Sequence, residues 1–253
     1  MLVPMRAILD AADKNGYAQG AFNVNAVCQV KAAVDVHQIL RSPAIIQGAD
    51  LANGFMGGRT DFANSTLEDK KAGAKNIGAT VKKYAADSDI PVALHLDHGK
   101  NFDSCIAAIE GGYTSVMIDG SSLPFDENVE LTREVVKYAH ERGVTVEGEL
   151  GVLAGVEDHV FAATSTYTNP LSAIDFFKKT GVDALAISYG TMHGANKGKN
   201  AVIRKEIAIA IKECMLHEGI EGYLVSHGSS TVPQYIVAVS YTHLRAHETS
   251  AHL

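Results

Sequence analysis

The sequence has little cysteine, no long apolar run and no cluster of basic residues, and each absence excludes a class of protein. Its three cysteines, Cys28, Cys105 and Cys214, lie far apart and form no C-x-x-C motif. We therefore expect a reduced, cytoplasmic protein without a disulfide or a cysteine metal site. With a formal net charge of −7 and no basic stretch, a nucleic-acid partner is not expected.

The apolar segments are also too short for a membrane protein. No run approaches the length of a transmembrane helix, and residues 1–16 lack the apolar core of a signal peptide. We expect no membrane partner. The chain has 253 residues, of which 46% are hydrophobic and 20% charged. This is ordinary for a globular core and long enough for one large α/β domain.

Seven short apolar runs recur along the chain, with longer amphipathic segments between them. The runs are Ala21–Asn25, Ala44–Gln47, Val92–Leu96, Ser115–Asp119, Thr145–Leu150, Ala184–Tyr189 and Gly222–His227. Several lack strict alternation, which is typical of strands covered on both faces. Glu127–Arg142 and Pro170–Thr180 have helical patterns, and each is followed by glycine. Strands that alternate with helices predict a parallel sheet.

Two architectures fit this alternation, a doubly wound sheet and a closed (β/α)₈ (TIM) barrel. No G-x-G-x-x-G motif follows the first run, so the dinucleotide-binding fold loses its usual support. We predict an α/β TIM barrel over residues 1–239 that lacks its eighth strand. Residues 240–253 have no apolar face or strand run and resemble translated sequencing adapter. We therefore treat them as a non-native-looking tail outside the barrel; a genuine disordered tail is the alternative.

Polar residues end the strand runs, where barrel enzymes assemble their active sites. Of eleven histidines, only His98, His193 and His227 are directly followed by glycine, and each lies at or just after a different run. Three imidazoles on one rim with an open fourth position are typical of catalytic zinc. The alternative for any one of them is a hydrogen-bonded structural histidine.

Several carboxylates lie on the same rim. Strand alternation places His95 and Asp97 on one face, so His95 is expected to support the site or the core. Asp97 could orient a zinc ligand or act as an acid or base. Of Glu147 and Glu149, one could be a paired charge inside the barrel. Glu157 lies in a long loop and could be a mobile general base.

Two loops rich in glycine and serine follow the later strands. Backbone N–H groups there suit a phosphate, and Lys197 adds a positive charge. The candidate phosphate-binding residues are Gly194, Lys197, Gly228, Ser229 and Ser230. No lysine occurs in the seven runs, which disfavours a Schiff-base aldolase mechanism.

At these residues the sequence resembles the class II, metal-dependent fructose-bisphosphate and tagatose-bisphosphate aldolases, from about Val3 to Val239. Six segments carry the resemblance in order: Val92–Gly99, Val116–Ser121, Val146–Gly151, Gly155–Asp158, Gly190–Gly194 and Val225–Gln234.

The resemblance implies a role for each candidate residue. His98, His193 and His227 would bind catalytic Zn²⁺, while Asp119 and Glu149 would hold a displaced or second divalent ion. Asp97 would be the acid or base at the bond that is cleaved, and Glu157 would move the proton of the dihydroxyacetone-phosphate half. Gly194, Gly228 and Ser230 would bind phosphate, together with a monovalent cation, Na⁺ or K⁺.

The implied reaction is reversible cleavage of a phosphorylated sugar, fructose 1,6-bisphosphate, to dihydroxyacetone phosphate and glyceraldehyde 3-phosphate. The resemblance also implies a homodimer or homotetramer at full length. Three alternatives stay open: a tagatose-1,6-bisphosphate aldolase, another metal-dependent barrel hydrolase, and a zinc-binding but inactive fragment. Three departures from the family matter here. Ala49 stands where a serine is usual, Asn196 stands before Lys197 where an aromatic residue is usual, and the Asn-x-Asp-Thr motif of the eighth strand is absent.

Overall fold

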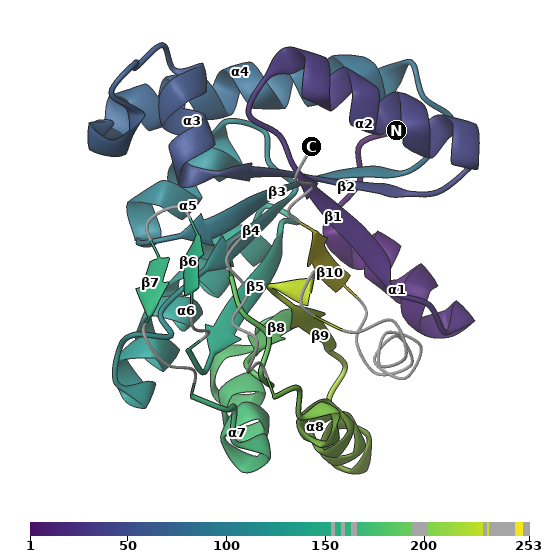
Figure 1. Cartoon of the computed structure of the whole chain (residues 1–253), viewed down its shortest axis with the longest axis vertical. Coiled ribbons are helices and arrows are strands. Elements are labelled where there is room, and N and C mark those ends of the chain that lie inside the picture. The colour runs from purple at the N-terminus through teal and green to yellow at the C-terminus, as the bar shows by residue number, and fades with distance from the viewer. Residues whose placement is uncertain are drawn as a thin grey trace.

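The computed structural model describes residues 1–152, 155–157, 160–162, 166–193, 202–229, 232 and 246–249. Strands and helices alternate through most of this length (Figure 1). The strands are β1 (Gln19–Asn23), β2 (Ala44–Ala49), β3 (Val92–Gly99), β4 (Ser115–Ile118), β5 (Thr145–Leu150), β6 (Gly155–Glu157), β7 (Val160–Ala162), β8 (Ala184–Ile187), β9 (Tyr223–Ser226) and β10 (Ala246–Thr249). The helices are α1 (Met5–Asn15), α2 (Val27–Leu40), α3 (Asp50–Met56), η1 (Phe62–Asn64), α4 (Leu67–Ala86), α5 (Phe102–Glu110), α6 (Phe125–His140), α7 (Pro170–Thr180) and α8 (Lys205–Glu218).

The strands form a closed parallel barrel in the order β1-β10-β9-β8-β5-β4-β3-β2. Helices surround it, as Figure 1 shows. The predicted α/β barrel is therefore confirmed, and the seven apolar runs correspond to β1, β2, β3, β4, β5, β8 and β9. The short strands β6 and β7 form a separate antiparallel pair in the segment after β5.

The eighth position of the barrel is filled from the tail. Ala246–Thr249 pairs with β1 on one side and β9 on the other, with Ala246 opposite both Gln19 and Val225. Our expectation that the tail takes no part in the sheet is wrong for these four residues. Exposed strand edges carry unpaired N–H and C=O groups, and backbone pairing to them requires no apolar pattern in the added strand.

Side chains alternate between an inner and an outer core. On β3, Leu94 and Leu96 belong to the outer core, which packs against the helices. Ala93 belongs to the inner core, which also contains Met5, Ile8 and Leu9 of α1. Because α1 packs into this inner core and contacts the starts of β5 and β8, it plugs the N-terminal end of the barrel.

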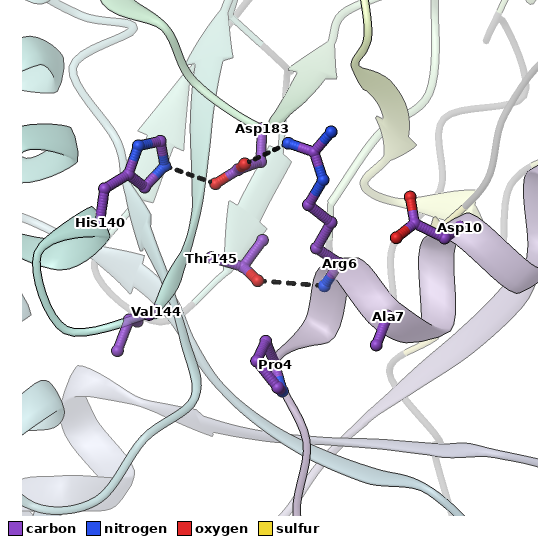
Figure 2. A pocket seen from close by; sticks show the side chains of 9 residues that line it. Pro4, Arg6, Ala7, Asp10, His140, Val144, Thr145 and Asp183 are labelled. Atoms are coloured by element: carbon purple, nitrogen blue, oxygen red, sulfur yellow. Dashed lines mark hydrogen bonds and ion pairs between the residues drawn. The ribbon is translucent and has the colours of Figure 1, made fainter.

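Polar contacts tie this plug to the strands (Figure 2). The backbone N–H of Arg6 donates to Thr145 Oγ1 at 3.0 Å, and Arg6 Nη1 donates to Asp183 Oδ1 at 2.9 Å. Asp183 Oδ2 also contacts His140 Nε2 at 2.8 Å and accepts from the Val146 N–H at 2.8 Å. The hydrogen bond to Asp183 raises the pKa of His140 above its ordinary value.

The two predicted helices are observed. In α6 the buried positions include Val129, Thr132 and Val136, as the sequence pattern predicts. Helix α7 has the predicted bounds, and the Asn169 side chain caps it by accepting from two backbone N–H groups. Within the described part of the chain, no helix combines the length and apolarity needed to span a membrane.

Candidate metal centre

Strand β3 delivers two adjacent polar side chains to the C-terminal end of the barrel. Ordinary alternation would turn Asp97 and His98 to opposite faces. His98 has φ of 45°, and the pairing of β3 with β4 shifts register between Leu96 and Gly99. Ligand atoms of Asp97, His98 and His227 consequently lie within 4.8 Å of one another. Left-handed backbone at a non-glycine residue is uncommon and tends to occur at functional sites.

The three predicted zinc-binding histidines meet at this end. The ring centroids of His98 and His227 are 4.8 Å apart, and those of His98 and His193 are 5.3 Å apart. The rings of His193 and His227 are separated by 6.1 Å. All three side chains are buried. Spacing along the chain could not show that they converge, whereas the barrel brings β3, β8 and β9 to a common rim.

Asp119 and Glu149 lie close to one nitrogen of the His98 ring, Nδ1. His98 Nδ1 is 3.2 Å from Asp119 Oδ2 and 3.6 Å from Glu149 Oε2. Burial opposes protonation of His98, but the charge of Asp97 and the hydrogen bond to Asp119 outweigh it and raise the His98 pKa to about 10. Burial would raise the Asp119 pKa as well, yet the hydrogen bond with His98 holds it well below its usual range.

Glu149 responds differently: its buried Oε2 has no hydrogen-bond partner among the described residues. Burial and the nearby charge of Asp119 raise the Glu149 pKa to about 8. Its backbone carbonyl accepts from Asn128 Nδ2 at 2.9 Å, which anchors the end of β5 to α6.

Asp97 is fully buried and has one donor to its side chain in the described structure. Asn23 Nδ2, at the end of β1, donates to Asp97 Oδ2 at 3.0 Å. Asp97 Oδ1 has no hydrogen-bond partner among the described residues. One carboxylate oxygen is thus held in place, while the other is available to a ligand.

The structure resolves the ambiguity between Glu147 and Glu149. Glu147 lies deeper and contacts His227 Nε2 through Oε1 at 2.9 Å. Its Oε2 is 3.5 Å from His95 Nε2. Burial lowers the pKa of His95, so this contact joins a neutral ring to a carboxylate rather than two charges. His95 is therefore placed in the barrel interior, as expected.

The donor set suits a divalent cation. His98 Nε2 is buried and has no hydrogen-bond partner within the described chain. Besides the set that contains Asp97, ligand atoms of His98, Asp119 and Glu149 also lie within 4.8 Å of one another. Imidazole nitrogens with carboxylate oxygens are ligands that zinc accepts.

Part of the predicted phosphate site lies outside the described residues, namely Gly194, Lys197 and Ser230. Glu157 ends β6, but its side chain is not among those described. Gly228 has φ of +61°, and a Cβ there would lie 2.5 Å from the Met192 carbonyl oxygen. Close packing of backbone against backbone thus explains this glycine, and phosphate binding by Gly228 and Ser229 stays a prediction.

Two neighbours of the site did not emerge from the sequence pattern. Asn23, whose Nδ2 donates to Asp97 Oδ2, and Ser115, whose Oγ is 2.8 Å from His95 Nδ1, lie within predicted strands but were not predicted as site residues. Ser115 stands opposite His95 in the register of β3 and β4. A one-residue change in register would remove this contact, and register between parallel strands is not readable from the sequence.

Known proteins resemble the chain over nearly its whole length. The family model described as "Fructose-bisphosphate aldolase class-II" matches residues 3–243. The fructose-bisphosphate aldolase of Treponema pallidum is 44% identical over 245 residues, which cover 92% of this chain and 70% of that protein. The fructose-bisphosphate aldolase of Giardia intestinalis is 42% identical over 234 residues, covering 92% and 67%.

Solved structures agree with these relatives. The YdjI aldolase of Escherichia coli K12 superposes with a TM-score of 0.78 at 26% identity, covering 99% of this chain and 82% of that one. A fructose-bisphosphate aldolase from Campylobacter jejuni has a TM-score of 0.80, covers 98% and 77%, and at 21% identity supports the fold alone.

These likenesses favour an aldolase over the metal-dependent hydrolase that the histidines alone left open. The family implies a divalent metal and a phosphorylated sugar substrate. The observed rim of histidines and carboxylates agrees with the metal. The chain belongs to the class II fructose-bisphosphate aldolase family, and it is an aldolase.

Proposed function

We propose that this protein is a zinc-dependent aldolase that reversibly cleaves fructose 1,6-bisphosphate to dihydroxyacetone phosphate and glyceraldehyde 3-phosphate. The observation that carries the proposal is the convergence of His98, His193 and His227 beside a buried Asp97. His98, His193 and His227 would hold Zn²⁺, with Asp119 and Glu149 near a second position for a divalent ion. Bound zinc supplies a Lewis acid that stabilises the negative charge developing on the ketone half of the sugar.

Asp97 is the group assigned to the proton of the substrate hydroxyl. In the cleavage direction it accepts the proton of the C4 hydroxyl, the C4–O bond becomes the aldehyde carbonyl, and the C3–C4 bond breaks. The electron pair of that bond stays on the dihydroxyacetone-phosphate half. Asn23 holds one oxygen of Asp97, so the other can face the substrate. Positioned acid or base catalysis of this kind contributes roughly 10²–10⁴-fold to a rate.

Glu157 is assigned to the second proton transfer, to C3 of the departing ketone half. It lies on the β6–β7 hairpin that follows β5. Segments of this kind on the active rim of a barrel commonly close over a substrate. Gly194, Lys197, Gly228, Ser229 and Ser230 are assigned to the substrate phosphates, where Na⁺ or K⁺ would also bind. We further propose a cytoplasmic location and a homodimer or homotetramer.

A coupled assay on the 253-residue protein tests this function. Fructose 1,6-bisphosphate and tagatose 1,6-bisphosphate are supplied in parallel, before and after treatment with a chelator, and then with added Zn²⁺. We expect cleavage of the fructose compound to stop with chelator and return with zinc. Cleavage that survives complete metal removal would refute the zinc mechanism, and a preference for the tagatose compound would change the substrate.

The alternative of a zinc-binding but inactive fragment has its own outcome in the same experiment. It predicts tight zinc binding without cleavage of either bisphosphate. The His98→Ala variant is the control for the metal site, because it removes an imidazole that lies in both candidate ligand sets. Zinc binding that is unchanged in this variant would place the metal elsewhere.

A further inference from the structure

Glu147, a buried carboxylate near the metal centre, has no role in the reaction described above. Glu147 is buried in the barrel interior, and its Oε1 lies 2.9 Å from Nε2 of His227. The same carboxylate faces Nε2 of His95 with its other oxygen at 3.5 Å. Nδ1 of His95 is in turn 2.8 Å from the hydroxyl of Ser115. None of these four side chains is more than 2% exposed.

Chemistry fixes the direction of these contacts. A carboxylate can only accept hydrogen bonds, so an imidazole nitrogen that points at Glu147 carries a hydrogen. His227 therefore donates from Nε2 to Glu147. A neutral imidazole has one N–H and one lone pair, which leaves the lone pair of His227 on Nδ1. His95 follows the same rule, with Nε2–H toward Glu147 and Nδ1 accepting from the Ser115 hydroxyl.

We propose that Glu147 is a positioning residue that holds His227 as its Nε2–H tautomer, with Nδ1 presented to the metal, while His95 and Ser115 hold Glu147 in place. The proposal rests on the proposed zinc-dependent function, since it assigns His227 a metal to face. Such carboxylate partners fix the tautomer and ring orientation of a ligand and make it more basic. His98 is arranged in the opposite sense, because its Nδ1 faces Asp119 and its buried Nε2 faces the site.

A purely structural role for Glu147 is the rival explanation, and the barrel contains a matched control. At the opposite end, Asp183 is also a buried carboxylate and lies 2.8 Å from a histidine nitrogen, Nε2 of His140. If any lost carboxylate–histidine pair weakened the protein enough to disturb the metal site, Asp183→Asn would act like a change at Glu147. If Glu147 is a positioning residue, changes at Glu147 should weaken metal binding and a change at Asp183 should not.

The experiment compares Glu147→Ala, Glu147→Gln and Asp183→Asn with the unchanged protein. Zinc affinity is measured by competition with a chelator, and the visible absorption of bound Co²⁺ reports on the ligand geometry. We expect Glu147→Ala to bind zinc roughly 10–100-fold more weakly, the range found when such partners are removed. Glu147→Gln should lose less, since its amide oxygen can still accept from His227. Asp183→Asn should keep the zinc affinity within about twofold and leave the Co²⁺ spectrum unchanged, because its site is remote.

A second measurement needs no variant and no metal. Long-range ¹H–¹⁵N NMR of the metal-free, histidine-labelled protein reports which nitrogen of each ring carries the hydrogen. We expect the Nε2–H form for His227 in the unchanged protein. The Nδ1–H form, or zinc affinity in a folded Glu147→Ala variant within twofold of the unchanged protein, would overturn the proposal.

The two proposals fail separately. If the unchanged protein does not bind zinc, the proposed function fails, while the NMR measurement still decides the tautomer of His227. If it binds zinc and the Glu147 variants bind equally well, only the positioning role fails. Should Glu147→Ala not fold, Glu147→Gln and the NMR measurement on the unchanged protein carry the test.

Discussion

The two ends of the barrel use the same kinds of residue in different ways. At the N-terminal end, Asp183 accepts from Arg6 and from a backbone N–H, contacts His140, and so has both oxygens engaged. At the C-terminal end, Asp97 and His98 are buried, yet each has an atom without a hydrogen-bond partner in the described structure. A buried polar atom without a partner costs stability, so its presence indicates a site arranged for a ligand.

The two ends of the barrel also differ in the side chains that fill them. Met5, Ile8 and Leu9 of α1 plug the N-terminal end with apolar side chains. The opposite end is lined by histidines and carboxylates whose pKa values shift in both directions, with Glu149 raised to about 8 and Asp119 well below its usual range. Perturbed titration of this kind is common at functional sites. The N-terminal end should therefore govern stability and the C-terminal end activity.

The largest effect is expected on activity, from Asp97→Asn at the C-terminal end. An amide cannot accept the hydroxyl proton, so kcat should fall about 10²–10⁴-fold, equivalent to roughly 3–5 kcal/mol on the barrier. The free energy of unfolding should change much less than the barrier to the reaction, because asparagine retains an acceptor oxygen for Asn23 Nδ2. The coupled assay and urea unfolding measure the two quantities. A loss of less than tenfold in kcat would show that Asp97 is not the acid or base.

Ile8→Ala should produce the largest effect at the other end. Ile8 is 1% exposed within the plug, and truncation of a buried isoleucine costs roughly 2–5 kcal/mol of unfolding free energy. Ile39→Ala is the matched control, since Ile39 is 79% exposed and should change stability by less than about 0.5 kcal/mol. Below the unfolding transition, kcat of Ile8→Ala should match that of the unchanged protein. A tenfold loss of kcat would instead show that the plug transmits strain to the metal centre.

A smaller loss is expected from Asp183→Asn. The amide retains one acceptor oxygen but turns an N–H₂ group toward a donor, which should cost about 1–3 kcal/mol of unfolding free energy. Part of the network is solvent-exposed, with the Arg6 side chain at 39%, which moderates the effect. Urea unfolding measures it. Stability equal to that of the unchanged protein would mean that the Arg6–Asp183–His140 network does not hold the plug in place.

The smallest effect concerns pH. The folded-state pKa of His140 is raised by its bond to Asp183, so its contribution to stability is fully present below the ordinary histidine pKa. That contribution is lost as pH rises through the raised value. His140 is 41% exposed, so the change should stay under about 1 kcal/mol. His140→Gln should remove this part of the pH dependence in urea unfolding measured from pH 5 to 9. An unchanged pH profile in the variant would assign the dependence to another group.

Much of the fold could be predicted from local patterns. The seven strand runs and helices α6 and α7 are observed close to their expected bounds, because parallel strands are apolar throughout and helices carry a periodic face. Strand β10 could not be predicted, since its pairing depends on two edges that exist only after the barrel has formed. Helix α1 lies within residues 1–16, for which the sequence pattern predicted no helix.

The candidate site, too, could be predicted only in part from the sequence. That His98, His193 and His227 follow strands is readable from the sequence, and membership of the aldolase family accords with the chemistry inferred for them. Which nitrogen of each ring faces the site is not readable, because it depends on partners such as Glu147 and Asp119 from other strands. Those partners depend on the register between strands and on which side chains of each strand point into the barrel.

The sequence by itself determined the alternation of strands and helices, the polar residues that end the strands, and the family. These are local or family-wide properties, and they can be recognised without knowledge of any tertiary contact. Only the tertiary structure decided that the tail completes the sheet, that positive φ at His98 turns it inward beside Asp97, and that Glu147 rather than Glu149 supports His227. Each of these depends on atoms that are far apart along the chain and meet only when the barrel closes.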